Sequence, residues 1–252
     1  MREERAHRIA PLLLAAGLLP ALLLAGCNRS EPPADQLEEA LSAKVDEVEQ
    51  KPQNAGPYAP RDECKSATGA SAFMAKVKAA VAARDTAAFV DLAAEDVKLD
   101  FGGGAGQAEL RSLLADAQAP LWAKLDEMMT LGCASDGDAL ITLPWYFAQE
   151  ISTDPYKAMI VTGEGVPVRE APAEAAPVVA AVSWDVVEML ENSSEPGGFA
   201  HVRWKLSEPI AGKPDVMEGY IEAARLRSLI DYRLLAASRN GKWRITSLIA
   251  GD

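Results

Sequence analysis

The stretch YRLLAASRNGKWRITSLI, residues 232–249, decides how this chain folds. Asn240-Gly241 separates two runs rich in apolar residues, and this pair suits a type I′ turn, in which both central residues take a positive φ. The stretch is therefore predicted to be a β-hairpin. Because an isolated hairpin is only marginally stable in water, its strands must pair with other strands of the chain.

Two earlier segments are candidate partners for this hairpin. VKLDF (97–101) alternates and is a predicted strand with Val97, Leu99 and Phe101 on one face, and ALITLPWYF (139–147) is a second predicted strand. Pairing with either one would make the C-terminus part of the domain that the N-terminal half forms. A hairpin that packs only on the strands between 156 and 230 would contradict this hypothesis.

Predicted helices accompany these two strands. GASAFMAKVKAAVAAR (69–84) has apolar residues at helical spacing, and Asp85 is a predicted N-cap of a second helix. Two further helices are predicted, one after the glycine cluster at 102–106 and one at 120–131. The order of helices and strands, ending in a G-x-W-x-I strand at 241–245, resembles the cone-shaped α+β fold of ketosteroid isomerase relatives. The resemblance implies an α+β domain that the C-terminal hairpin completes.

The N-terminus has the pattern of an export signal. A basic start precedes an apolar run from Ile9 to Ala25, which is shorter than the roughly 20 residues of a membrane-spanning helix. LAGC (24–27) resembles the lipobox of bacterial lipoproteins. The resemblance implies that residues 1–26 are removed and that Cys27 is lipidated, which would anchor the protein to a membrane of the bacterial envelope, facing the periplasm. Asn28, where an Asp would favour the inner membrane, favours the outer membrane.

Composition limits the partners of the chain. Its net charge of −12 opposes binding to nucleic acid, and 49% hydrophobic residues predict a packed core. Residues 27–63, rich in proline and acidic side chains, are predicted to be a tether between the lipid and the folded part. Within it, residues 35–50 have the pattern of one short helix.

Three cysteines remain to be assigned. If Cys27 carries lipid, Cys64 and Cys133 are left as a pair in an oxidising compartment, which predicts a disulfide. Metal binding is the weaker interpretation, because the two residues lack C-x-x-C spacing and have no nearby histidine. No metal site and no cofactor are predicted.

Residues 156–230 contain short strand patterns and frequent turns. GVPVREAPAEAAPVVAAV (165–182) resembles the opening of bacterial Src homology 3 (SH3) domains, where a V-x-V-R strand precedes a proline turn and a second strand. DVVEML (185–190), FAHVRW (199–204) and GYIEAARL (219–226) follow in the order of that family.

This resemblance implies a small barrel of five or six strands that binds cell-wall peptides or protein segments through aromatic side chains. The matching positions are Trp184, Phe199, Trp204 and Tyr220. Aromatic residues on short strands also commonly pack in a core, so this alternative stays open. Residues 203–218 are longer than the corresponding loop of the family and predict an extended surface loop.

The sequence contains little that points to catalysis. His201 is the one histidine after residue 27 and lies in a predicted strand without an obvious nucleophile, so histidine acid–base catalysis is poorly supported. The motifs G-x-S-x-G and H-E-x-x-H are absent. An enzyme would instead need a carboxylate such as Asp100 to line an apolar cavity.

These observations predict an α+β fold with a domain at 64–155, an SH3-like domain at 156–230 and a C-terminal hairpin at 231–252. The leading hypothesis is a lipid-anchored binding protein of the cell envelope whose SH3-like domain recognises peptidoglycan or a partner protein. One alternative is a small-molecule or enzymatic pocket in the α+β domain. Another is a structural subunit of an envelope complex.

Overall fold

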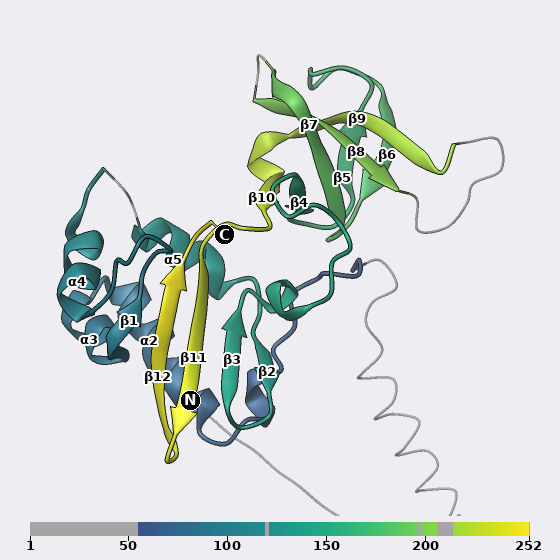
Figure 1. Cartoon of the computed structure of the whole chain (residues 1–252). Coiled ribbons are helices and arrows are strands. Elements are labelled where there is room, and N and C mark those ends of the chain that lie inside the picture. The colour runs from purple at the N-terminus through teal and green to yellow at the C-terminus, as the bar shows by residue number, and fades with distance from the viewer. Residues whose placement is uncertain (1–54, 119–120, 196–197, 206–213, 252) are drawn as a thin grey trace, which may run out of the picture. The chain divides into compact units, whose positions relative to one another are not determined.

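Two sheets organise the chain in a computed structural model, which describes residues 55–118, 121–195, 198–205 and 214–251 (Figure 1). One sheet has five strands and is accompanied by helices, whereas the other has seven antiparallel strands. The fold is therefore α+β, as the sequence predicted. Lys51–Asp252 form one compact unit, so both sheets belong to the same body.

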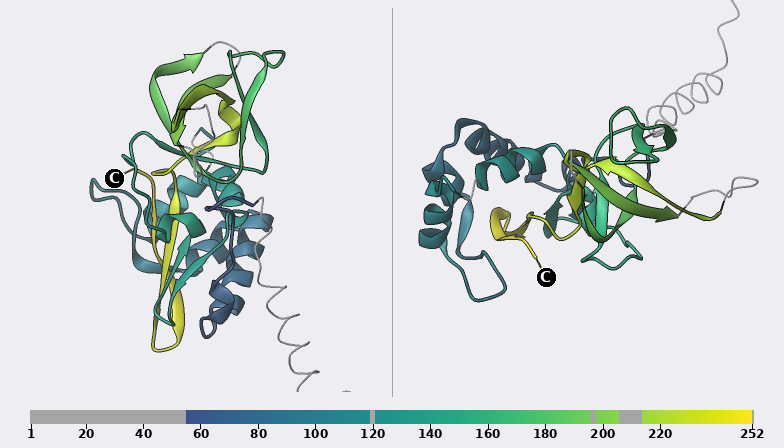
Figure 2. Two further views of the ribbon diagram at one scale, coloured as in Figure 1. Left: turned by 90° about the vertical axis from the view of Figure 1, so that its right-hand side faces the viewer. Right: turned by 90° about the horizontal axis from the view of Figure 1, so that it is seen from above.

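The C-terminal hairpin lies in the middle of the five-stranded sheet, whose strand order is β1-β12-β11-β3-β2. Asn240 and Gly241 have φ values of 53° and 73°, which confirms the predicted type I′ turn. β11 pairs with β3 and β12 pairs in parallel with β1, so both predicted partners are used. The left view of Figure 2 shows the two hairpin strands side by side from a second direction. The strand bounds are β1 (Ala93–Lys98), β2 (Ala134–Asp136), β3 (Leu140–Leu143), β11 (Arg233–Arg239) and β12 (Lys242–Ile249).

The helices pack their apolar side chains against this sheet. Asp85 caps α3, because its carboxylate accepts a hydrogen bond from the Ala88 N–H at 3.0 Å. Phe89 and Leu125 from the helices and Ile245 from β12 are fully buried in one cluster, which forms the larger core. The helices are α2 (Ala70–Ala83), α3 (Thr86–Asp91), α4 (Gln107–Ala115) and α5 (Leu121–Met129), with 3-10 turns η1 (Cys64–Ser66), η2 (Trp145–Ala148) and η3 (Ala223–Arg225).

The two strands predicted at 97–101 and 139–147 have different bounds in the structure. β1 ends at Lys98, and Phe101 is 48% exposed instead of sharing the buried face. The chain turns there because the Asp100 carboxylate accepts the Gly104 N–H at 2.7 Å. β3 ends at Leu143 because the following proline has no N–H to donate to the ladder, and the chain continues as η2.

The seven-stranded sheet has the order β10-β4-β7-β8-β9-β5-β6. Its outermost strands β10 and β6 are not paired with each other within the described residues, so the strand pairing does not close a barrel. The β8–β9 ladder continues to Lys205 opposite Val216, which shortens the loop expected at 203–218. Residues 206–213 of that loop lie outside the described residues. The strands are β4 (Ala158–Val161), β5 (Val166–Arg169), β6 (Val178–Val182), β7 (Val186–Glu195), β8 (Phe199–Lys205), β9 (Val216–Glu222) and β10 (Leu226–Ser228).

The last part of the predicted tether, 27–63, belongs to the fold. Residues 55–63 are described, and the Tyr58 N–H donates a hydrogen bond to the Trp184 carbonyl at 2.8 Å. The tether must therefore end before residue 55, because this backbone is held by the folded unit. Cys27 and its lipobox lie outside the described residues.

A disulfide joins Cys64 to Cys133, with the two Cα atoms 5.7 Å apart. These are the two cysteines that remained as a pair once lipid was assigned to Cys27. The bond connects η1 to the residue that precedes β2 and closes a long loop that contains α2 to α5. Within the described residues, no helix combines the length and the apolar character that crossing a bilayer requires.

A buried charge network joins the two sheets. Arg227 on β10 is 3% exposed, and its guanidinium donates hydrogen bonds to the Tyr146 hydroxyl and to the Tyr232 carbonyl. Its Nε lies 3.1 Å from a Glu127 carboxylate oxygen. Burial raises the pKa of Tyr146 to about 12, against the opposing effect of the Arg227 charge. Since Tyr146 and Glu127 precede the seven-stranded sheet in the chain, this network is a joint between distant segments.

Asp231 completes this joint. Burial alone would raise the pKa of its carboxyl, but the Lys124 ammonium at 2.7 Å, the Tyr232 N–H and the Arg227 charge together lower it. The Asp231 carboxylate is therefore charged at neutral pH and interacts with Lys124, Arg227 and the Tyr232 N–H. Lys124 lies on α5, so the contact ties a helix of the first sheet to the segment that leaves the second sheet.

Candidate functional site

The four aromatic residues that the SH3 resemblance singled out do not form one surface. Phe199 and Trp204 are only 4% and 7% exposed, and Trp204 packs with Val202 in the core of the seven-stranded sheet. Trp184 is partly buried against a separate cluster between the two sheets. For Phe199 and Trp204 this burial favours the alternative of core packing, and strand alternation turns Trp204 inward. Tyr220 is partly buried, and alternation along β9 turns its side chain away from the buried Gly219 and Ile221.

Tyr220 is held in place by a histidine on the neighbouring strand. His201 on β8 lies opposite Tyr220 on β9 in the ladder register. Their rings stack with centroids 4.7 Å apart and an interplanar angle of 15°. His201 occupies the strand predicted for it, and its ring gives Tyr220 a fixed orientation. An oriented tyrosine ring offers both an apolar face and a hydroxyl to a ligand.

Charged side chains continue the surface that carries this aromatic pair. Arg203 lies two residues after His201, so it projects from the same side of β8. Its Nε is 3.2 Å from a Glu218 carboxylate oxygen, and its Nη1 is 3.7 Å from Glu188. We call this side the outer face of β7–β9 and define it by five residues: Glu188, His201, Arg203, Glu218 and Tyr220.

The outer face opens into a groove of about 390 Å³. Arg203 and Glu188 belong to both, and residues 150–153 also line the groove. Burial raises the pKa of Tyr58 in this groove, and the Asp185 charge adds to the effect, so its hydroxyl stays protonated and can donate a hydrogen bond. The ionisable lining residues carry both signs: Glu150, Asp185, Glu188, Arg203 and Lys205.

This arrangement is suited to binding a ligand of mixed charge. Opposite charges within one groove match a ligand that carries both amines and carboxylates, as peptides do. Among the described residues, no three His, Cys, Asp or Glu side chains gather as metal ligands.

Asp100, the carboxylate proposed for an enzyme, does not line an apolar cavity. Its side chain is exposed and binds the backbone of its own turn at Gly104. This residue therefore shapes a loop, because its oxygen is already occupied by a local N–H. Asp100 therefore does not meet the condition that the enzymatic alternative set for it.

The alternation of polar and apolar residues in FAHVRW (199–204) indicated which side chains form the outer face, although the SH3 resemblance singled out only aromatic residues. In FAHVRW the polar residues His201 and Arg203 alternate with Ala200, Val202 and Trp204, which predicts a half-buried strand. The alternation identifies the outward side chains. It does not identify Glu218 or Glu188, because these come from strands whose register is set by the fold.

Comparison of the chain with protein-family models and with curated proteins found no match. The functional argument therefore rests on the residues of the site.

Proposed function

We propose that this protein is a lipid-anchored binding protein of the bacterial cell envelope, and that its seven-stranded part is an SH3-like module that recognises peptides of peptidoglycan. The observation that carries the proposal is the outer face of β7–β9, where the stacked Tyr220–His201 pair adjoins a groove with charges of both signs. Peptidoglycan peptides present amines, carboxylates and apolar side chains close together, which this surface complements.

The order of the strands supports the SH3-like assignment. β5 and β6 pair across the proline-containing turn that the resemblance requires, and β7, β8 and β9 follow as successive antiparallel neighbours. VVEML (186–190) and FAHVRW (199–204) thus lie in β7 and β8 in the order of that family, whereas GYIEAARL continues from β9 through η3 into β10. Arg169 on β5 also pairs with Tyr220 on β9, so β5 lies next to the tyrosine that we propose contacts the ligand.

The anchor and the compartment rest on the cysteines. LAGC at 24–27 supports lipidation of Cys27. The disulfide between Cys64 and Cys133 is of a kind that persists in the oxidising compartments outside the cytoplasm. Several acyl chains on one residue would hold the protein stably at a membrane.

Sedimentation with insoluble peptidoglycan tests the proposed ligand. The chain from residue 27 onward should co-sediment, and Tyr220→Ala or Arg203→Ala should reduce its affinity about tenfold, as removal of a central interface residue usually does. Tyr156→Ala is the matched control, because Tyr156 is 64% exposed and does not line the groove. It should bind like the unsubstituted chain.

Two results would overturn the proposed ligand. The first is a chain that stays in the supernatant at every protein concentration tested. The second is an equal loss of binding in the Tyr220 variant and the Tyr156 control, since binding would then not involve the outer face. If sedimentation fails and crosslinking yields one stoichiometric envelope protein, the module recognises a protein segment instead.

The anchor has its own test. Cys27→Ser should release the protein from the membrane fraction without changing its unfolding curve, because Cys27 precedes the compact unit. If that variant remains membrane-bound at mature size, lipidation at Cys27 is refuted.

A further inference from the structure

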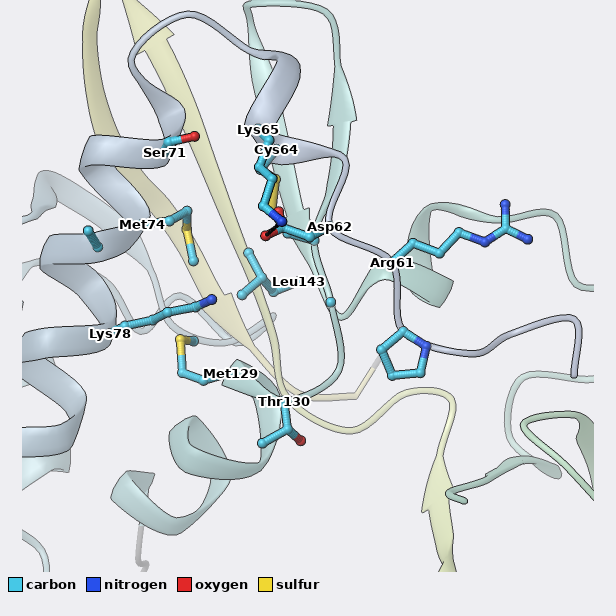
Figure 3. A pocket seen from close by; sticks show the side chains of 14 residues that line it. Arg61, Asp62, Cys64, Lys65, Ser71, Met74, Lys78, Met129, Thr130 and Leu143 are labelled. Atoms are coloured by element: carbon cyan, nitrogen blue, oxygen red, sulfur yellow. Dashed lines mark ion pairs between the residues drawn. A yellow bond between two sulfur atoms is a disulfide. The ribbon is translucent and has the colours of Figure 1, made fainter. Parts of the chain in front are cut away.

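A second hollow lies beside the five-stranded sheet and contains none of the residues of the outer face. It has a volume of about 410 Å³ and is bordered by α2, the end of α5, β3 and the segment at 60–65 (Figure 3). This volume falls within the range of small-molecule sites in proteins. The hollow is therefore large enough for a ligand of its own.

The floor of this pocket is apolar and rich in sulfur. Met74 from α2, Met129 at the end of α5 and Leu143 from β3 line it, together with the disulfide between Cys64 and Cys133. In Figure 3 the side chain of Met74 lies above that of Lys78 and the side chain of Met129 lies below it, all three to the left of Leu143. Thioether side chains adapt to apolar groups of different shapes, so this floor suits a flexible hydrocarbon body better than a rigid polar one.

One ammonium group points into this apolar pocket. Figure 3 shows Lys78 reaching from α2 toward Leu143, between the two methionines. Lys78 has no hydrogen bond or ion pair with any residue that the structure describes. An unpaired cation beside apolar side chains favours the approach of an anion.

The other charges at the pocket are already engaged. Lys65 and Asp62 form an ion pair at 3.5 Å, so these two charges offset each other. Arg61 points away from the pocket in Figure 3, with its guanidinium carbon 4.5 Å from the centroid of the Trp145 ring. Lys78 is thus the free charge of the lining, and the pocket is locally positive in a chain of net charge −12.

We propose that this pocket binds a small amphipathic anion, with its carboxylate or phosphate head on the Lys78 ammonium and its hydrocarbon body on Met74, Met129, Leu143 and the disulfide. The charge selects the head group, because a neutral head leaves the ammonium unpaired. The apolar floor selects the body, at about 0.8 kcal/mol for each buried methylene. This site is independent of the peptide surface proposed above.

Calorimetric titration of the chain from residue 27 onward, with Cys27→Ser to exclude its own acyl chains, tests the proposal. Octanoate and octyl phosphate represent the two head groups, and the tighter of them identifies the preferred one. Saturable binding of either supports the site. 1-Octanol should bind at least tenfold more weakly because it lacks the charge, and butanoate at least tenfold more weakly because it lacks most of the apolar body.

Two variants of α2 locate the site. Lys78→Gln should weaken binding of the anion about tenfold, whereas Lys76→Gln should leave it unchanged, because Lys76 is exposed on the same helix and does not line the pocket. Ala75→Glu is a second test at an exposed lining position, where a carboxylate beside Lys78 would compete with the ligand. None of these side chains is buried, so the fold should be retained.

The proposal is overturned if neither anion binds saturably, if 1-octanol binds as tightly as octanoate, or if Lys78→Gln and Lys76→Gln behave alike. Because none of these residues touches the outer face, peptidoglycan sedimentation of the Lys78 variant should stay normal. Failure of the pocket is thus distinguishable from failure of the peptide surface.

Discussion

The two sheets use their faces differently. The five-stranded sheet and its helices bury a large apolar cluster in which Phe89, Leu110 and Leu125 are completely inaccessible. The seven-stranded sheet buries a smaller cluster, mainly of valines such as Val168 and Val202, and keeps charged residues on its other side. An antiparallel sheet with one solvated face can present that face to a ligand. A sheet packed by helices leaves room for ligands only at its margins, which is where the Lys78 pocket lies.

The joint between the two sheets differs from both cores, because it combines apolar contacts with a buried cation. The strongest test of this difference is Arg227→Met. Loss of the guanidinium would leave the Tyr146 hydroxyl and the Tyr232 carbonyl without this donor, and would leave Glu127 and Asp231 with Lys124 as their remaining cation. The free energy of unfolding should therefore fall by about 3–5 kcal/mol. Urea denaturation measures this change.

Arg225→Met is the control for the joint. Arg225 is exposed and lies two residues earlier, so its replacement should change the free energy of unfolding by no more than about 0.5 kcal/mol. A similarly small effect of Arg227→Met would show that apolar packing alone holds the two sheets together.

The second prediction concerns the helical part. Replacing both Cys64 and Cys133 by alanine should lower the free energy of unfolding by about 2–4 kcal/mol, because the disulfide restricts a long loop in the unfolded chain. Denaturant curves with and without the double substitution measure the loss. Cys27→Ser should leave the same curve unchanged, and an equal effect of both changes would contradict a structural role limited to the Cys64–Cys133 bond.

The third prediction concerns how stability changes at alkaline pH, where Tyr146 in the joint loses its proton. The pKa of Tyr146 is about 12 in the folded protein, against 10.0 for an ordinary tyrosine, so the folded state holds its proton more tightly than the unfolded state. Stability from this group is complete below pH 10 and is lost as the pH rises from 10 to 12. The loss should be on the order of 2 kcal/mol.

Unfolding midpoints at a series of pH values measure this titration. Tyr146→Phe should flatten the slope between pH 10 and 12, whereas Tyr156→Phe should not, because Tyr156 is exposed. Identical slopes in both variants would mean that Tyr146 is not the group responsible.

The smallest effect is expected on the outer face. Arg203→Gln breaks ion pairs with Glu188 and Glu218, but all three side chains are between 32% and 48% exposed, so the free energy of unfolding should change by less than about 1 kcal/mol. The same substitution should weaken peptidoglycan binding clearly. A variant that loses stability and binding together would indicate that these charges stabilise the sheet. The charged face would then not be free to serve a ligand alone.

Local pattern was sufficient for much of the fold. The spacing of Phe73, Val77 and Val81 predicted α2, and the carboxylate of Asp85 caps α3 as expected. Each of these features depends on residues within one or two helical turns. The strand ends at Lys98 and Leu143 were less predictable, because a side-chain contact and a proline interrupt apolar patterns that otherwise continue.

The candidate sites were predicted less completely. The resemblance singled out Tyr220 and Trp204 alike, and it could not separate the partly buried ring of Tyr220 from the buried ring of Trp204. Lys78 was part of a predicted helix with no assigned role. Its importance follows from Met129 and Leu143, which lie far away in the sequence and meet it only across the pocket.

The sequence by itself determined the turn at Asn240-Gly241, the helical periods and the pair of cysteines left for a disulfide, because such features depend on spacing along the chain. The tertiary structure alone decided that the C-terminal hairpin pairs with both β1 and β3 in the middle of a sheet. It also decided that Arg227 is buried in a joint and that Lys78 lies beside methionines without an ion pair to any other described residue. Contacts between distant segments depend on which surfaces exclude water together, and that is a property of the packed chain.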